Sequence, residues 1–316
     1  MDQAERDVRT PNLSDLDIAW QIVHEVLEPT PLVPSPIASR GSLKLETLQP
    51  IGAFKVRGAL AALSSLEEGK RAVTASAGNH GLGVAWAASH LSRAATIVVS
   101  RNASPAKVEA IRAFPIELVE HGADYDEAER HALALGMADD ASFVSPYNDP
   151  MVIAGQGTIG LELDMQSDDE LTVVAPVGGG GLLSGLALWS RTRDDVHLAG
   201  VESTESRAVS AAIAAGRIEP TPVGETMADG LAGNLEPGSV TPGILKNIPL
   251  VAVDDAELRD AMRWLFANHG IVAEASGAAG AAAVLAGSIE ITGQLVVVIS
   301  GRNIAATRYA EVLQGA

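Results

Sequence analysis

Short runs of apolar, often β-branched residues alternate with longer stretches of helical periodicity along this 316-residue chain. Such alternation is typical of βα units whose strands pair in a mainly parallel sheet that helices cover. We therefore predict an α/β protein with open, mainly parallel, twisted sheets flanked by helices. The strands that we expect span residues 42–46, 72–75, 96–100, 117–120, 171–175, 197–202 and 295–300.

Two segments rich in turn-forming residues indicate where the chain passes between parts of the fold. Residues 144–150 read VSPYNDP, and residues 218–243 are rich in Pro, Gly and Thr. We interpret the first segment as a crossing between two lobes. The expected small lobe spans residues 71–147 and is inserted into a large lobe made of residues 1–70 and 148–316.

The composition argues against several classes of function. Lys and Arg number 22 against 40 Asp and Glu, which gives a formal charge of −18 that repels nucleic acid and anionic lipid surfaces. The absence of cysteine excludes disulfides, thiolate catalysis and iron–sulfur clusters. The charged N-terminus and the interrupted apolar stretches predict neither a signal peptide nor a membrane span. We expect a cytoplasmic protein without nucleic-acid or membrane partners.

A run of four glycines follows the strand expected at residues 171–175. Residues 177–182 read VGGGGL and precede a helical pattern at residues 182–190. Backbone N–H groups of such a loop, together with the positive end of the helix, suit a phosphate monoester. The run lacks the lysine of a Walker loop, and its spacing does not clearly fit a dinucleotide site. An ordinary tight connection stays an open alternative.

Lys55 lies in the segment QPIGAFKVRG, residues 49–58, where we expect a helix to begin at Ala53. The positive end of that helix would lower the pKa of the amine and favour the neutral form that forms a Schiff base. An isolated lysine on a helix is more often a solvated surface residue. The surrounding motifs therefore have to distinguish a Schiff-base lysine from a surface lysine.

Two further segments place polar groups where strands end. Residues 74–81 read TASAGNHG, so backbone N–H groups, the Ser76 hydroxyl and the Asn79 amide could bind a carboxylate. Ser76 or Asn79 could equally cap a helix, and His80 could be packed without a catalytic role. Ser300 follows a buried strand, at the sheet edge where open α/β folds bind ligands.

Taken in order, these motifs resemble the threonine dehydratase and serine racemase branch of the fold-type II pyridoxal-phosphate enzymes, which have a two-lobed fold like that of the tryptophan synthase β chain. The resemblance covers roughly residue 29 to the C-terminus. The motifs that carry it are LKLETLQPIGAFKVRGA, ASAGNHG, AGQGT, PVGGGGLLSG, TMADGLAG and ISGRN.

The resemblance implies that pyridoxal 5'-phosphate is the cofactor and that Lys55 holds it as a Schiff base. It places Phe54 on the face of the pyridine ring, Asn79 at the ring hydroxyl and Ser300 at the ring nitrogen. The residues implied to bind the cofactor are Phe54, Lys55, Asn79, Gly178, Gly179, Gly180, Gly181, Leu182 and Ser300. Because a serine hydroxyl does not keep the ring nitrogen protonated, elimination is favoured over long-lived carbanion chemistry.

The activity implied is that of an ammonia-lyase, or dehydratase, which converts L-threonine, L-serine or a relative such as 3-hydroxyaspartate into a 2-oxo acid and ammonia. Lys55 and Ser76 are the implied catalytic residues, and Ser76, Ala77, Asn79 and His80 the implied substrate-binding residues. A homodimer is implied as well. Serine racemase and a non-catalytic relative are the alternatives. Ala77 argues against a racemase, because resembling racemases carry a second serine there.

Some positions depart from the family pattern. Relatives hold a divalent cation with two acids, of which the first matches Glu202 and the second is Ala208 here. We therefore expect no metal. Glu202 is kept as a weak candidate, with Glu205 as a substitute second acid.

Arg302 replaces a glycine and could contact substrate, a partner subunit or solvent. The chain stops at residue 316, so we expect neither a C-terminal regulatory domain nor isoleucine feedback. Substrate choice could depend on Tyr147, Met227, Ala228, Glu274 and Arg302.

Overall fold

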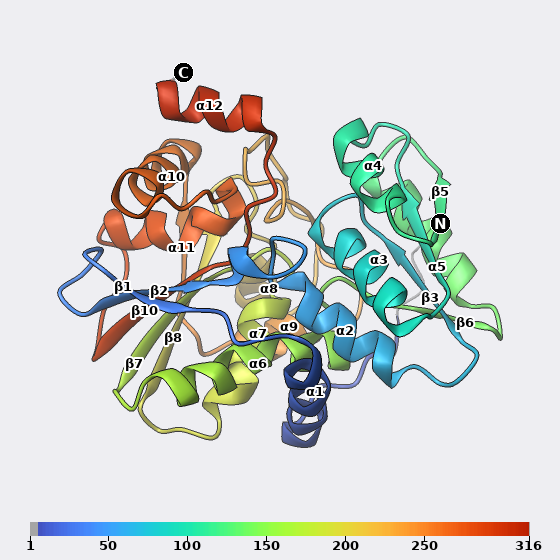
Figure 1. Ribbon diagram of the computed structural model, residues 1–316, viewed down its shortest axis with the longest axis horizontal. Coiled ribbons are helices and arrows are strands. Elements are labelled where there is room, and N and C mark those ends of the chain that lie inside the picture. Colours follow the sequence, from blue (N-terminus) through green and yellow to red (C-terminus); the bar gives the residue numbers. More distant parts are fainter. Residues whose placement is uncertain (1–5, 316) are drawn as a thin grey trace.

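The computed structural model describes residues 6–315 and arranges the strands in two separate sheets (Figure 1). In the larger sheet the strand order is β1-β2-β10-β7-β8-β9, and only the β1–β2 pair is antiparallel. These strands are β1 (Leu32–Ser35), β2 (Gly41–Leu45), β7 (Leu171–Pro176), β8 (Val196–Ser203), β9 (Leu250–Val253) and β10 (Gln294–Ile299). The smaller sheet is parallel, with the order β5-β4-β3-β6. Its strands are β3 (Arg71–Ala75), β4 (Ala95–Val99), β5 (Glu117–Glu120) and β6 (Ala141–Phe143).

Helices bury both faces of the larger sheet, because successive side chains of a strand point to opposite faces. Val296 and Val298 pack with α6 and α7, whereas Leu295 and Val297 pack with α10 and α11. The helices are α1 (Leu13–Val26), α2 (Lys55–Ser65), α3 (Asn79–Leu91), α4 (Pro105–Arg112), α5 (Tyr125–Gly136), α6 (Pro150–Gln166), α7 (Gly181–Ser190), α8 (Ala208–Ala215), α9 (Thr241–Leu245), α10 (Asp255–His269), α11 (Ala275–Leu285) and α12 (Ala306–Gln314), with the 3-10 helix η1 (Glu46–Leu48). Within residues 6–315, no helix is long and apolar enough to cross a membrane.

The predicted α/β class with mainly parallel sheets is confirmed, and all seven expected strands form within one residue of their predicted bounds. Three short strands were not predicted. β1 contains Pro34 and lies at a sheet edge, β6 has only three residues, and β9 is a half-buried edge strand. The lobe boundaries after residues 70 and 147 stay a prediction.

Helix α6 lies against both α2 and α7, and glycines make these contacts close. A Cβ atom at Gly155 of α6 would lie 2.6 Å from the Cα atom of Gly58 in α2. A Cβ atom at Gly157 would lie 2.7 Å from the carbonyl oxygen of Gly185 in α7. Real Cβ atoms do not approach other atoms so closely, so the backbones of these helices touch only because side chains are absent.

A fully buried ionic cluster joins β2, η1, α2 and α6. Arg57 donates to both carboxylate oxygens of Glu46 at 2.7 and 2.8 Å and to Glu162 at 2.6 Å. Lys44 donates to the other Glu162 oxygen at 2.5 Å and to the carbonyl of Thr30 at 2.7 Å. The four charges balance, and each has a hydrogen-bonded partner, which is the condition under which burial of charge is tolerated.

Candidate active site

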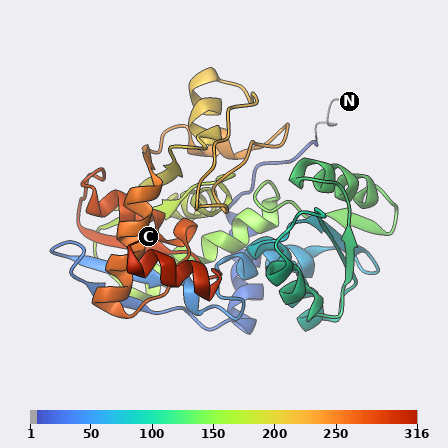
Figure 2. The same cartoon turned by 90° about the horizontal axis from the view of Figure 1, so that it is seen from above.

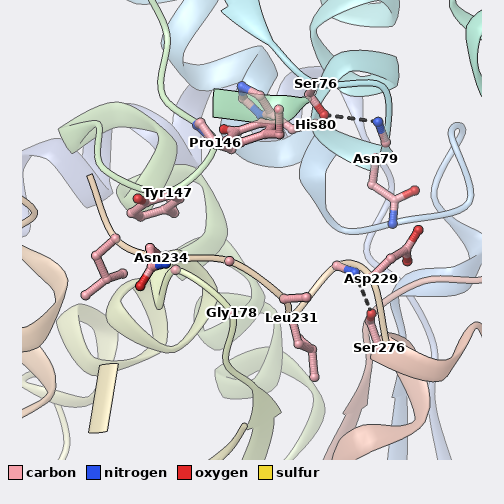
Figure 3. A pocket seen from close by; sticks show the side chains of 18 of the residues that line it. Ser76, Asn79, His80, Pro146, Tyr147, Gly178, Asp229, Leu231, Asn234 and Ser276 are labelled. Atoms are coloured by element: carbon pink, nitrogen blue, oxygen red, sulfur yellow. Dashed lines mark hydrogen bonds between the residues drawn. The ribbon is translucent and has the colours of Figure 1, made fainter. Parts of the chain in front are cut away.

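A cleft of about 1920 Å³ lies between the two sheets, at the carboxyl ends of their strands. Strand ends are represented in its lining by Ser76 after β3, Ser100 after β4, Gly178 after β7 and Ser300 after β10. Figure 3 shows Ser76 on one side of the cleft and Gly178 on the other. The fold therefore brings the glycine run and the Ser76 segment, which are distant in sequence, to one cavity.

Lys55 lines this cleft at the first residue of α2. Its Nζ atom donates to the carbonyl oxygen of Pro146 at 2.6 Å and lies 5.2 Å from the centre of the Phe54 ring. Burial lowers the pKa of Lys55 to about 8. The lowering has loss of hydration as its cause, while the contribution of the positive helix end stays a prediction. The helix also begins at Lys55 and not at Ala53.

The turn between β3 and α3 lines the cleft with residues 76–80. The Ser76 hydroxyl accepts from the N–H of Gly78 at 3.1 Å, and α3 begins at Asn79. His80 is buried, with Nε2 at 3.2 Å from the Val144 carbonyl oxygen. Burial, reinforced by the nearby charge of Lys55, lowers the pKa of His80 to about 3. His80 is therefore a neutral, packed donor, which was one of the two interpretations left open for it.

Asn79 connects the two walls of the cleft. Its amide nitrogen donates to Glu274 at 2.6 Å, and its amide oxygen accepts from the side chain of Asn303 at 2.7 Å. Burial raises the pKa of Glu274 to about 7. A Cβ atom at Gly301 would lie 2.1 Å from Glu274 Oε1, so residue 301 has to be glycine for the carboxylate to lie there. Glu274 therefore fixes the orientation of the Asn79 amide.

The glycine loop, residues 178–181, has the shape expected of an anion cradle. Gly180 has a φ of 87° and immediately precedes α7, so the loop N–H groups gather at the positive end of that helix. A Cβ atom at Gly179 would lie 2.3 Å from the Tyr147 ring, and one at Gly178 would lie 2.8 Å from the carbonyl oxygen of Gly230. The Thr241 hydroxyl donates to the Gly179 carbonyl at 2.7 Å and steadies the loop.

These residues fit pyridoxal phosphate. The cradle supplies donors for a phosphate, the buried amine of Lys55 suits a carbonyl carbon, and the Ser300 hydroxyl lines the same cleft. Phe54 also lines it, and its N–H donates to the Ser300 carbonyl at 3.0 Å, which links the lysine segment to the end of β10. Ala77 and Leu182 complete the predicted set among the lining residues.

Several site residues were not identified from the sequence. The Pro146 carbonyl and the Thr241 hydroxyl lie in turn-rich segments whose folding the periodicity does not determine. Glu274 and Tyr147 were named only as positions that could affect substrate choice. The VSPYNDP turn next to the expected crossing was the available signal for Pro146 and Tyr147, and nothing local marked Thr241.

The two remaining candidates are Glu202 and Arg302, and neither of them lines the cleft. Glu202 is buried and accepts from the backbone N–H groups of Val209 and Ser210 and from the Ser210 hydroxyl, so it holds the start of α8. In the described part of the chain, no three His, Asp or Glu side chains are grouped as metal ligands. Arg302 is exposed, is absent from the cleft lining and donates through its backbone N–H to Gly52.

Residues 23–301 match the family of pyridoxal-phosphate dependent enzymes, and the chain belongs to that family. The predicted family and its cofactor, pyridoxal phosphate, are thereby confirmed.

Among the similar proteins is an L-threonine ammonia-lyase of Thermotoga maritima, 40% identical over 92% of this chain and 75% of that protein. Another, from Geobacter sulfurreducens, is 38% identical over 83% of this chain and 66% of that protein. The catabolic L-threonine dehydratase of Escherichia coli is 34% identical over 85% and 84%. Among solved structures, maize serine racemase superposes with a TM-score of 0.88 at 28% identity, covering 97% of this chain and 98% of that one.

Proposed function

We propose that this chain is a pyridoxal-phosphate dependent ammonia-lyase that converts L-threonine or L-serine into a 2-oxo acid and ammonia. The observation that carries the proposal is the buried Lys55 amine in a cleft that also holds the glycine loop, Ser300 and the Ser76 turn. The similarity to L-threonine ammonia-lyases supports the choice of reaction.

When bound, the cofactor supplies a conjugated ring that withdraws electrons from the substrate Cα atom. The residues of the chain would do the rest. The N–H groups of residues 77, 79 and 80 and the Ser76 hydroxyl would hold the substrate carboxylate, since the N–H groups of Ser76 and Gly78 already donate to the Val98 carbonyl and the Ser76 hydroxyl. Lys55, with a pKa of about 8, would be sufficiently neutral near neutral pH to take the Cα proton as a base. Loss of the β-hydroxyl and hydrolysis of the resulting enamine then give the products.

Each predicted binding residue has a place in this scheme. The glycine loop and Leu182 would hold the phosphate, and Phe54 the ring face. Asn79 would reach the ring hydroxyl with the second hydrogen of the amide nitrogen that already donates to Glu274. Ser300 would meet the ring nitrogen. Ala77 lines the cleft without a hydroxyl, so it offers no acid for the opposite face of Cα, which favours dehydration over racemisation.

The quaternary state and the compartment are also proposals. The resemblance implies a homodimer, the cytoplasm is the compartment expected by default, and the excess of acidic residues is compatible with a protein that avoids nucleic acid. Light scattering of the purified protein tests the dimer, and a monomer at micromolar concentration would contradict it.

The function is tested with purified protein, pyridoxal phosphate and L-threonine or L-serine. We expect an absorption band of the lysine-bound cofactor near the violet edge of the visible spectrum, and keto acid and ammonia in equal amounts. Lys55→Ala should abolish both. Lys107→Ala is the matched control, because Lys107 also lines the cleft but its amine pairs with Asp229 and not with the Pro146 carbonyl.

The other outcomes separate the alternatives. A cofactor band with D-serine formed from L-serine, and little keto acid, would replace the proposal by a racemase. A band without any product would leave a cofactor-binding protein with another substrate or none. Absence of a band in wild-type protein supplied with cofactor would overturn the proposal.

A further inference from the structure

The turn at residues 145–148, here called the SPYN turn, carries the hydrogen-bond acceptor of the Lys55 amine. The Pro146 carbonyl accepts from Lys55 Nζ at 2.6 Å. Ser145 closes the turn, since its hydroxyl oxygen accepts from the N–H of Asn148 at 3.0 Å. The position of this turn therefore decides where the free amine of Lys55 is held.

Glu236, which lies in the segment between α8 and α9, holds the SPYN turn in place through hydrogen bonds. Its carboxylate accepts from the Ser145 hydroxyl at 2.5 Å, and its backbone N–H donates to the Tyr147 hydroxyl at 2.6 Å. A third bond runs from the N–H of Val240 to the side-chain oxygen of Asn148 at 3.1 Å. Three hydrogen bonds thus tie the turn to residues 236–240.

The Glu236 carboxylate is itself buried, with 6% of the residue exposed. Its counter-charge is Arg6, whose Nη1 lies 3.0 Å from Glu236 Oε2 and whose guanidinium lies 5.0 Å from the centre of the Phe143 ring. Arg6 belongs to the N-terminal arm, residues 6–12, which leads away from α1 toward the N-terminus (Figure 2). The arm therefore supplies a cation to a carboxylate at the wall of the cleft.

The other titratable groups that face Glu236 are acids. They are the hydroxyls of Tyr147 and of Tyr125, which donates to Glu129 at 2.8 Å, and Arg6 also acts on the buried carboxylate of Asp149 at the start of α6. Burial raises the pKa of Glu236, and Arg6 opposes that rise. Without Arg6, a buried carboxylate beside these acids would be left without its counter-charge, which is unfavourable until it takes up a proton or water.

We propose that Arg6 is a positioning residue of the active site: by neutralising Glu236 it keeps the SPYN turn, and with it the Pro146 carbonyl, against the amine of Lys55. The inference rests on the proposed function, because the position of this amine matters only if Lys55 binds the cofactor. Its effect is greatest whenever Lys55 is free, namely during cofactor capture and in the part of each turnover in which the substrate amine has displaced it.

The test measures cofactor capture by protein freed of pyridoxal phosphate, followed by the absorption band of the bound cofactor without substrate. Arg6→Ala should raise the half-saturating cofactor concentration about tenfold, a change typical of coupling between connected sites. Arg6→Lys should recover most of the loss. Arg9→Ala is the matched control, because Arg9 lies on the same arm but pairs with Asp15 at the start of α1.

A second measurement distinguishes loss of the Arg6 charge from a general loss of packing around the SPYN turn. Protonated Glu236 needs no counter-charge, so the defect of Arg6→Ala relative to wild type should shrink as the pH is lowered. Glu236→Gln keeps the shape without the charge, and adding Arg6→Ala to it should cause no further loss. Thermal unfolding of each cofactor-free variant shows whether it is folded.

The failures of the two proposals are distinct. If wild-type protein shows no cofactor band, the proposed function fails. If wild-type protein binds the cofactor but Arg6→Ala and Arg9→Ala behave alike, or if Arg6→Ala weakens Glu236→Gln as much as wild type, Arg6 does not act through Glu236 and the inference is wrong.

Discussion

The reactivity of Lys55 depends on how little water reaches its amine. An exposed lysine amine is almost entirely protonated at neutral pH, whereas burial favours its neutral form. The single hydrogen bond to the Pro146 carbonyl orients the amine without supplying a negative charge that would keep it protonated. The site would therefore make Lys55 a nucleophile by removing water from its amine.

Cofactor capture should follow the protonation of this amine. Because only the neutral form attacks a carbonyl, we expect the capture rate to rise about tenfold per pH unit below about 8 and to level off above it. Stopped-flow absorbance of cofactor-free protein mixed with pyridoxal phosphate measures this profile. A midpoint near 10.5, the ordinary lysine value, would show that the amine is hydrated. Lys107→Ala should leave the midpoint unchanged.

At this scale, the sequence predicts the residues that directly precede or follow a strand, but not the partners that orient them. Ser76 and Ser300 occupy positions that motif and strand end define together, whereas Lys55 was identified from its motif and lies at the start of α2. Glu274 approaches Asn79 from 195 residues further along the chain, so no local pattern contains that contact. The burial that lowers the pKa of Lys55 was not predicted either, because burial is a property of the assembled cleft.

Among the elements, the glycine loop shows how a cradle depends on what packs behind it. Tyr147 fills the space that a side chain at residue 179 would need, and its hydroxyl is held by the N–H of Glu236. The loop can present its N–H groups to a ligand only while this ring stays in place. Gly179 is thus fixed by a neighbouring side chain, whereas Gly180 is fixed by its own φ of 87°.

Gly179→Ala should therefore disturb both stability and phosphate binding. The added Cβ atom would lie 2.3 Å from the Tyr147 ring, and overpacking of this kind costs about 1–3 kcal/mol of unfolding free energy. Urea unfolding of the cofactor-free protein and titration with pyridoxal phosphate measure the two effects. Gly243→Ala is the control, since Gly243 lines the same cleft with no atom within 4 Å of its Cβ position. Equal behaviour of the two variants would contradict the account.

Every strand of five or more residues was predicted, whereas of the four shorter strands only β5 was. β7 and β10 read as continuous apolar runs because helices cover both faces of the larger sheet. β6 and β9 obtain their strand conformation from pairing with β3 and β8, which is a tertiary effect.

For the whole molecule, the buried cluster of Lys44, Glu46, Arg57 and Glu162 joins β2, η1 and α6 to α2, the helix that carries Lys55. Arg57 lies two residues after Lys55 and contacts carboxylates from η1 and α6. The cluster therefore contributes to the placement of Lys55 although it lies outside the cleft lining.

Arg57→Met should leave two buried carboxylates with one cation. Removing one partner of a buried ion pair typically costs about 3–5 kcal/mol, so we expect a large fall in the urea midpoint of the cofactor-free protein. Arg112→Ala is the surface control, because its pairs with Glu109 and Glu120 are exposed and should not change the midpoint measurably. A loss below about 1 kcal/mol for Arg57→Met would show that water or protonation compensates the carboxylates.

The glycine contacts of α6 have a consequence for recognising distant relatives. The motif AGQGT contributes Gly155 and Gly157, which touch Gly58 of α2 and Gly185 of α7 and are not among the residues that line the cleft. The motif therefore reflects the close spacing between α2, which carries Lys55, and α7, which follows the glycine loop. A homologue that had lost Lys55 but kept both helices at this separation would retain the same glycines. A sequence search that uses this motif would therefore find proteins with the same fold. The presence or absence of the lysine would then distinguish enzymes from relatives without activity.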